Sequence, residues 1–301
     1  MATQSSRAPD FRPDHRPLRS VLYMPASNRR AIDKARGLDC DAVVLDLEDA
    51  VAPDLKAEAR TALCEEVAAG GFGYRRMIAR INGLSTPWGK DDLAALAVAP
   101  IGALLAPKVD SAEDVIALSE AMDAAGYGPH VALWVMIETP RAILALERIA
   151  ECAGSTRLAA FVLGLNDLAK DTGMAQQPGR AAFVPVLSHA VMAARAHGLA
   201  ILDGVCNAID DPVRLEGECC QARDFGFDGK TLIHPSQLDL ANRVFAPSES
   251  DVAEARAIVD AFADPANAGK GALRVNGKMA ELLHRDMAKR LIEKAESISA
   301  R

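Results

Sequence analysis

From residue 20 onward, short apolar runs of strand length alternate with longer segments of helical period. The segments between the runs carry helix boundary residues: 53–70 begins at a Pro and ends on Gly, and 111–126 begins at a Ser and ends on Gly. Strands alternating with helices in this way predict βα units and a parallel sheet. The predicted strands are 20–25, 42–49, 75–82, 103–109, 131–139, 159–167, 199–205 and 228–234.

Eight βα repeats over roughly 220 residues match the size of a (β/α)8 TIM barrel, whereas a doubly wound sheet seldom needs so many even crossovers. We therefore expect a disordered N-terminal arm over 1–18, a TIM barrel over 19–245 and a C-terminal helical extension over 246–301. Within the extension, a loop rich in Gly, Ala and Asn at 265–277 separates two helical stretches. This loop is a candidate hinge that would let the last helix pack on a neighbouring subunit.

Composition narrows the range of partners. The chain has 301 residues, a net charge of −7 and only 4% aromatic residues, which argues against a nucleic acid or an anionic membrane surface and favours a small molecule. No run approaches the 18 or so apolar residues of a membrane span. The six cysteines lack metal-binding spacing, and the N-terminal segment lacks a secretory apolar run. We expect a cytoplasmic protein.

Polar and charged residues follow most of the predicted strands, at the end where TIM barrels carry their active sites. Any one of them could simply begin a loop, but carboxylates gathered at one mouth repel each other unless a cation lies between them. Oxygen ligands favour Mg²⁺, and an arginine beside them would bind an anion. This pattern predicts a metal site that stabilises an enolate or alkoxide. The residues are Asp46, Glu48, Asp49, Arg80, Asn82, Lys108, Glu138, Asn166, Asp167, Asp203 and His234.

An ordered series of motifs extends this prediction. Taken together, the motifs resemble the citrate lyase β-subunit family, also called the HpcH/HpaI aldolase or malyl-CoA lyase family, from residue 19 to about residue 298. Each motif is short, but the ordered set is specific. The motifs are RSVLYMPASNRRAIDKA (19–35), DAVVLDLEDAVAPDLKAEAR (41–60), ARING (79–83), MIETPRAI (136–143), GLNDLAKDTG (164–173), DGV (203–205) and FDGKTLIHPSQL (227–238).

The resemblance implies a trimeric or hexameric TIM barrel that uses Mg²⁺ to cleave or form a C–C bond between a CoA thioester and a keto acid. It implies that Glu138 and Asp167 bind the metal and that Arg80 binds the substrate. It also implies that Glu48 and Asp49 orient metal-bound water and the arginine. For Asp46, a buried hydrogen-bonding role is an equally good interpretation.

The first βα turn and the GKTLIHPSQ segment are similar to the parts of the family that contact CoA. Ser27 is explained equally well as a helix N-cap. His234 could cap a helix, lie in the core or take part in catalysis. The implied CoA contacts are Ser27, Arg29, Arg30, Lys34 and Lys230.

The C-terminal segment GKMAELLH, at 277–284, departs from the family pattern. In many relatives this segment reaches from a neighbouring subunit and supplies an Asp as acid or base. Here Glu281 takes the Asp position, and Leu282 replaces the following Pro. Glu281 is either that acid or base, or a residue favoured at a helix start by the helix dipole.

We therefore expect a Mg²⁺-dependent lyase that converts (3S)-malyl-CoA, β-methylmalyl-CoA or citramalyl-CoA to an acyl-CoA plus glyoxylate or pyruvate. A (3S)-malyl-CoA thioesterase using the same metal site is the first alternative. A citrate lyase β-type subunit acting on a carrier-protein thioester is the second. A small aldolase acting on free hydroxy-keto acids is disfavoured by the GKM segment.

Overall fold

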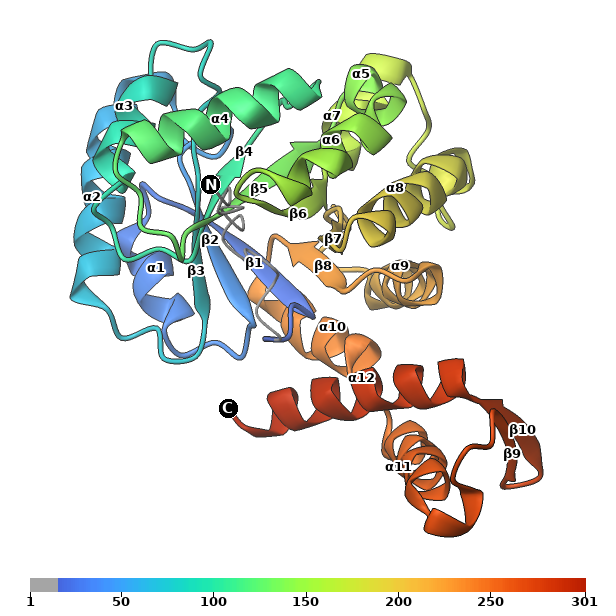
Figure 1. The fold of residues 1–301 in the computed structure, drawn as a ribbon. Helices are drawn as coiled ribbons and strands as arrows, with labels where there is room; N and C mark the ends of the chain where they lie inside the picture. The colour runs from blue at the N-terminus through green and yellow to red at the C-terminus, as the bar shows by residue number, and fades with distance from the viewer. Residues whose placement is uncertain (1–15) are drawn as a thin grey trace, which may run out of the picture.

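The computed structural model describes residues 16–301 and contains a closed barrel of eight parallel strands (Figure 1). Each strand pairs with the next, and β1 pairs with β8 to close the barrel. The predicted TIM barrel is confirmed. The strands are β1 (Ser20–Pro25), β2 (Ala42–Asp46), β3 (Arg76–Arg80), β4 (Ala103–Ala106), β5 (Ala132–Ile137), β6 (Leu158–Leu163), β7 (Ala200–Asp203) and β8 (Gly229–Leu232).

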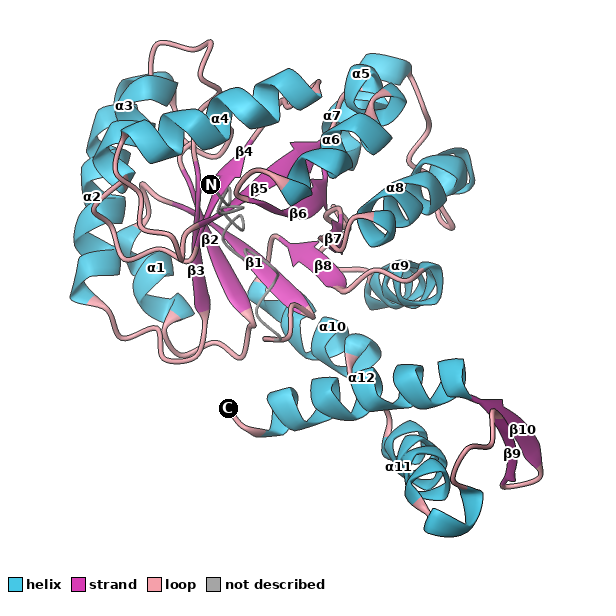
Figure 2. Ribbon diagram, in the orientation of Figure 1, coloured by secondary structure: helices cyan, strands magenta, loops and turns pink. Residues whose placement is uncertain are grey.

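Helices surround the barrel on its outer face (Figure 2). Local sequence fixes several of their starts: Ser111 accepts a hydrogen bond from the Asp114 amide at the start of α4, and Asp211 does the same for α9. These helices are α1 (Arg29–Ala35), α2 (Lys56–Ala69), α3 (Gly89–Leu96), α4 (Ala112–Ala124), α5 (Pro140–Leu144), α6 (Leu146–Glu151), α7 (Leu165–Thr172), α8 (Val184–Ala196), α9 (Pro212–Phe225) and α10 (Leu238–Phe245). No helix among residues 16–301 has the length and apolar character needed to cross a membrane.

The strands bury both of their faces. Along β1 and β2, Val21 and Val44 belong to one apolar cluster, while Leu22 and Leu45 belong to a second, larger cluster that includes apolar residues of the surrounding helices. The first cluster also contains Trp134, whose side chain is almost completely buried. The barrel interior is thus packed with side chains, and a cavity can open only where polar residues replace them at the strand ends.

Residues near the chain start also pack on the barrel. Leu18 is buried and belongs to the same cluster as Val21. The packed part of the barrel therefore begins slightly before residue 19. The prediction of a disordered arm otherwise concerns residues 1–15, which lie outside the described residues.

The C-terminal extension consists of α11 (Glu249–Ala263), a hairpin of β9 (Ala272–Val275) and β10 (Lys278–Glu281), and α12 (Leu282–Ser299). The sequence analysis predicted a hinge loop over 265–277, but its second half forms the first strand and the turn of this hairpin. Asn276 and Gly277 both have positive φ, as a two-residue hairpin turn requires.

The end of α12 attaches to the face of the barrel opposite the active-site mouth. Arg301 lies 2.5 Å from Asp41, which directly precedes β2, and its guanidinium stacks on Tyr74, which lies shortly before β3. From this contact, α12 extends about 27 Å to Glu281, at about 1.5 Å per residue. In Figure 1 the hairpin correspondingly lies away from the barrel.

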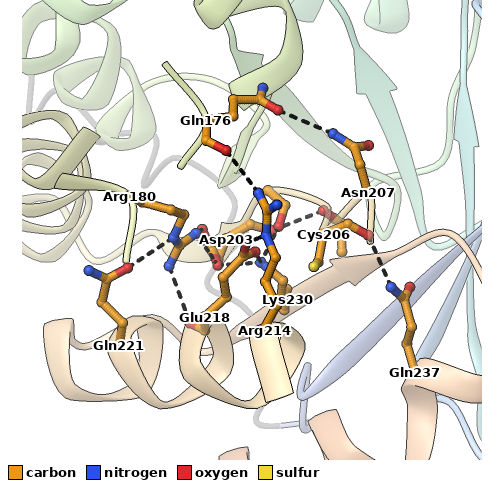
Figure 3. Close-up of polar contacts among 12 residues, drawn as sticks. Gln176, Arg180, Asp203, Cys206, Asn207, Arg214, Glu218, Gln221, Lys230 and Gln237 are labelled. Atoms are coloured by element: carbon orange, nitrogen blue, oxygen red, sulfur yellow. Dashed lines mark hydrogen bonds and ion pairs between the residues drawn. The ribbon is translucent and has the colours of Figure 1, made fainter. Parts of the chain in front are cut away.

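A buried cluster of charges ties β7, β8 and α9 together (Figure 3). The Lys230 ammonium donates to Asp203 at 2.7 Å, to the Gly204 carbonyl at 2.6 Å and to Glu218 at 3.1 Å. Arg180 donates to both carboxylate oxygens of Asp203 at 2.8 Å. Lys230 is fully buried, so all three of its donors are used within the protein. The cluster balances its charges internally, which is the condition for placing them in a core.

We predict that Lys230→Met lowers the free energy of unfolding by about 3 kcal/mol, because it leaves part of the charge on Asp203 and Glu218 uncompensated in the core. Denaturant unfolding would measure this loss. Lys90→Met is the matched control at an exposed lysine, and we expect it to change stability by less than about 0.5 kcal/mol. Equal stabilities of K230M and K90M would contradict the account of the cluster.

Candidate functional site

The carboxyl ends of the barrel strands surround a cavity of about 320 Å³. Asp46 ends β2, Arg80 ends β3, and Asp167 lies in the first turn of α7, directly after β6. These residues come from three separate βα units, and they meet because all parallel strands of a barrel end at the same mouth. The polar and sulfur-containing residues lining the cavity are Tyr23, Asp46, Asp49, Arg80, Met136, Asn166, Asp167 and Thr231.

Arg80 is the fixed cation of this cavity. Its Nε and Nη2 atoms each donate to one oxygen of Asp46 at 2.6 Å, and its Nη1 lies 2.7 Å from Glu48 and 3.6 Å from Asp49. Asp46 also accepts hydrogen bonds from the backbone amides of Glu48 and Ala50. The buried hydrogen-bonding interpretation of Asp46 is therefore confirmed: it holds the guanidinium in one orientation through a bidentate pair.

Glu48 is held close to Arg80 but is still difficult to ionise. Its removal from water raises the pKa of the carboxyl to about 8, although Arg80 opposes the shift. Asp49, Glu138 and Asp46 add to the rise because they surround Glu48 with negative charge. Glu48 can consequently take up and release a proton near neutral pH.

Glu138 directly follows β5 and is almost completely buried. Its Oε1 accepts a hydrogen bond from the backbone amide of Lys108 at 2.8 Å, and Lys108 has the rare positive φ of 53°. Within residues 16–301, its Oε2 has no hydrogen-bond partner. The Lys108 ammonium lies 2.5 Å from Asp167 and 3.6 Å from Glu138. One cation thus lies within reach of both carboxylates.

These residues fit a magnesium ion. Glu138 Oε2 is a buried acceptor without a partner, and Gly164 leaves space beside it, because a Cβ at that position would lie 2.6 Å from this oxygen. Among the described residues, no group of three or more His, Cys, Asp or Glu side chains could hold a metal. Mg²⁺ is commonly bound by one or two carboxylates, with water and substrate oxygens completing the shell. Glu138 and Asp167 match that requirement.

Comparisons with known proteins identify the family. Residues 19–235 match the family model of the HpcH/HpaI aldolase/citrate lyase. The chain belongs to this family.

The relatives include two kinds of enzyme. The chain is 46% identical over 284 residues to a (3S)-malyl-CoA thioesterase of Cereibacter sphaeroides, which covers 94% of this chain and 96% of the relative. It is 34% identical over 312 residues to an L-malyl-CoA/β-methylmalyl-CoA lyase of the same species, which covers 96% of this chain and 98% of the relative.

A solved structure with the same overall fold is the CitE protein of Mycobacterium tuberculosis in complex with magnesium, acetoacetate and coenzyme A. It is 29% identical to this chain, has a TM-score of 0.74, and covers 94% of this chain and 100% of its own. The likeness therefore includes the C-terminal extension as well as the HpcH/HpaI barrel.

Four predicted CoA contacts lie together on the first βα unit. Ser27, Arg29 and Arg30 line a hollow of about 510 Å³ beside α2, and Lys34 is exposed on the same short helix. Arg29 pairs with Glu65 and Glu66, so part of its charge is already balanced. The N-cap interpretation of Ser27 is wrong, because Asn28 caps α1 and accepts from the Ala31 amide.

The prediction that Lys230 contacts CoA is wrong. Its ammonium is fully buried and donates hydrogen bonds to Asp203, Gly204 and Glu218. The residue belongs to the charge cluster of the barrel wall and offers no donor to a ligand at the surface.

His234 and Glu281 both lie at helix starts. His234 accepts from the Ser236 amide at the short helix that follows β8, which confirms the capping interpretation. Glu281 forms a capping box with His284 at the start of α12, as the helix-start interpretation predicts. The C-terminal end of α12 lies at the face of the barrel opposite the Arg80 cavity, and Glu281 is at the other end of this helix. Glu281 therefore does not line the Arg80 cavity of its own chain.

The sequence analysis missed several residues that line the cavity, including Tyr23 and Gly164. Tyr23 sits near the end of β1, and strand alternation from the inward-facing Val21 could have placed it in the barrel interior. Gly164 was noted only as a letter of its motif, and its closeness to Glu138 depends on the pairing of β5 with β6.

We predict that Glu138→Gln weakens Mg²⁺ binding at least about 100-fold, since even residues that only support metal ligands are worth about 10- to 100-fold in affinity. Calorimetric titration with MgCl2 measures the loss. Glu113→Gln is the control at an exposed carboxylate, and we expect its affinity to equal that of the wild type. Equal affinities of E138Q and wild type would exclude Glu138 as a ligand.

We predict that Glu48 makes stability depend on pH. Its pKa is about 8 in the folded protein against an ordinary value of 4.5, so the folded chain keeps a proton that the unfolded chain has lost. The free energy of unfolding should therefore fall as the pH rises from about 4.5 to 8, by up to about 1.4 kcal/mol per pH unit from this group. Below and above that window the contribution is constant.

Glu48→Gln removes this contribution, so the stability of E48Q relative to wild type should increase with pH across the window. Denaturant unfolding at several pH values measures the difference. Glu58→Gln, at an exposed carboxylate of α2, should follow the wild-type curve. Parallel curves for E48Q and wild type would contradict the raised pKa.

Proposed function

We propose that this protein is a Mg²⁺-dependent thioesterase that hydrolyses (3S)-malyl-CoA to malate and CoA. The observation that carries the proposal is the 46% identity to a (3S)-malyl-CoA thioesterase over nearly the whole of both chains, against 34% to a malyl-CoA lyase. This order reverses the sequence analysis, which placed the lyase first.

The state of Glu281 supports hydrolysis. In the lyase chemistry of the family, the C-terminal carboxylate acts as acid or base near the thioester. In this chain, Glu281 is longer than the usual Asp and is engaged in the capping box of α12. Hydrolysis does not require that carboxylate, because the Arg80 cavity contains carboxyl groups of its own.

The residues of the cavity divide the work as follows. Arg80, oriented by Asp46, binds the carboxylate of the malyl group. Glu138 and Asp167 would hold Mg²⁺, which supplies a Lewis acid for substrate oxygens and lowers the pKa of water. Glu48, whose pKa of about 8 leaves a fraction of it ionised near neutral pH, accepts the proton of the attacking water in that form.

The reaction balances with water as the only co-substrate. The water oxygen bonds to the thioester carbonyl carbon while Glu48 takes one of its protons. The C–S bond then breaks, and the sulfur leaves with the proton as the CoA thiol. The Ser27–Lys34 segment is our proposed contact for the CoA phosphates, because Arg30 and Lys34 form no ion pair with the residues from 16 onward.

The lyase is the second candidate, because the relatives at 34% identity carry that activity in their names. In that reaction the C–C bond would open to glyoxylate and acetyl-CoA in the same cavity. Glu281 could then act only from a neighbouring subunit.

We propose that the extension does pack on a second copy in a homotrimer or homohexamer. Around the end of the hairpin and the start of α12, Met279, Leu283 and Met287 are more than half exposed. Exposed apolar residues grouped in this way are typical of an interface. The six free cysteines suit a reducing compartment, and we propose the cytoplasm.

The deciding experiment follows two products at once. Purified protein with Mg²⁺ and (3S)-malyl-CoA should release one free thiol per ester consumed and no glyoxylate, and EDTA should abolish the release. Arg80→Lys should lower kcat/KM by at least about 100-fold, because lysine cannot form the bidentate pair with Asp46. Lys90→Met is the control that should retain wild-type activity.

Glyoxylate formed in proportion to the ester consumed would contradict hydrolysis and support the lyase reaction instead. Neither product, with the protein folded and Mg²⁺ present, would overturn the proposal altogether.

A further inference from the structure

Tyr23 occupies a position in the Arg80 cavity that neither the metal site nor the hydrolysis explains. It lies near the end of β1, pairs in register with Val44 of β2 and lines the cavity. The Arg80 guanidinium lies over its ring, 5.1 Å from the centroid. The ring thus supports the cation through a cation–π contact, and the hydroxyl group is left for another role.

The hydroxyl of Tyr23 has only a weak acceptor. Its oxygen lies 3.9 Å from Met136 Sδ, and no oxygen or nitrogen of the described chain accepts its proton. Arg80 Nη1 lies 3.6 Å from the same sulfur. A thioether is a poor acceptor, so the Tyr23 hydroxyl and Arg80 Nη1, which also lies 2.7 Å from Glu48, converge on a sulfur that matches neither donor well.

Tyr127, a buried tyrosine, shows the contrast. The hydroxyl of Tyr127 donates to the Leu93 carbonyl at 2.8 Å, an ordinary structural hydrogen bond. Buried hydroxyls are normally satisfied in this way. Tyr23, which is only partly buried, has a sulfur as its partner among the described residues and lines a cavity beside Arg80.

We propose that the Tyr23 hydroxyl is a substrate-binding donor that, together with Arg80 Nη1, holds one carboxylate oxygen of the malyl group in the space beside Met136 Sδ, closer to both donors than the sulfur is. This inference rests on the proposed function, since it assigns a place to the carboxylate of that substrate. Methionine is flexible and can give way to the oxygen without a backbone change.

The chemistry suits a carboxylate. Arg80 already supplies a cation and lies against Asp46, Glu48 and Asp49, and the neutral hydroxyl of Tyr23 adds a hydrogen bond without adding charge. Burial raises the pKa of Tyr23 above its ordinary value, so the phenol keeps its proton over the working pH range. A hydrogen bond to a charged group is worth about 10- to 100-fold in binding.

The test is direct binding of L-malate to the Mg²⁺-loaded protein by calorimetry. Tyr23→Phe keeps the ring over Arg80 and removes one oxygen, and it should weaken malate binding about 10- to 100-fold. Binding of free CoA, which has no malyl carboxylate, should change by less than about twofold. KM for malyl-CoA should rise by a similar factor to the malate dissociation constant, with a smaller change in kcat.

Tyr127→Phe is the matched control. It removes a buried hydroxyl of structural role, so it should lower the melting temperature but leave malate binding at the wild-type value. A malate affinity of Y23F within about threefold of wild type would overturn the inference. So would an equal weakening of malate and CoA binding, which would indicate general disruption of the site.

The two proposals fail in different ways. If the wild type releases thiol from malyl-CoA but Y23F binds malate normally, the Tyr23 inference alone is wrong. If the wild type binds malate through Tyr23 but releases no thiol, the proposed hydrolysis is wrong and the anion site stands. If the wild type binds no malate, the Tyr23 inference is overturned.

Discussion

The pairing of Arg80 with Asp46 is the interaction on which the site depends. Both side chains are buried, and both guanidinium–carboxylate contacts measure 2.6 Å. An arginine cannot give up its proton in a protein, so this cation is permanent, and Asp46 fixes where it points. Glu48, Asp49 and Tyr23 take their positions around it.

One guanidinium does not balance all the carboxyl groups at the mouth. Burial is the main reason that the pKa values of Glu48 and Glu138 are raised. Neighbouring carboxylates add to the rise, because Asp46 balances most of the charge of Arg80. A dication between Glu138 and Asp167 would relieve this excess. The Lys108 ammonium lies within reach of the same two carboxylates in the structure. The demand for a second cation is therefore built into the mouth of the barrel.

The barrel and the centre of the site could be predicted from the sequence for the same reason. Eight apolar runs with polar residues at their ends imply one sheet with one mouth, and Arg80, Glu138 and Asp167 must then converge. Lys230 could not be placed in this way, because its burial depends on the strand register, which sets it opposite Asp203 of the neighbouring strand β7. The hairpin of the extension did leave a signal, Asn276–Gly277, which the sequence analysis assigned to a loop. The relation of Tyr23 to Met136 depends on packing across the barrel and left none.

The central claim is that Glu138 and Asp167 form a metal site beside Arg80. The most direct measurement is an anomalous difference map from a crystal soaked with Mn²⁺, which takes the same oxygen ligands as Mg²⁺. The account predicts one strong peak per chain between Glu138 Oε2 and Asp167, with the Lys108 ammonium moved away. A peak elsewhere in the barrel, or none while Lys108 still bridges the two carboxylates, would contradict it.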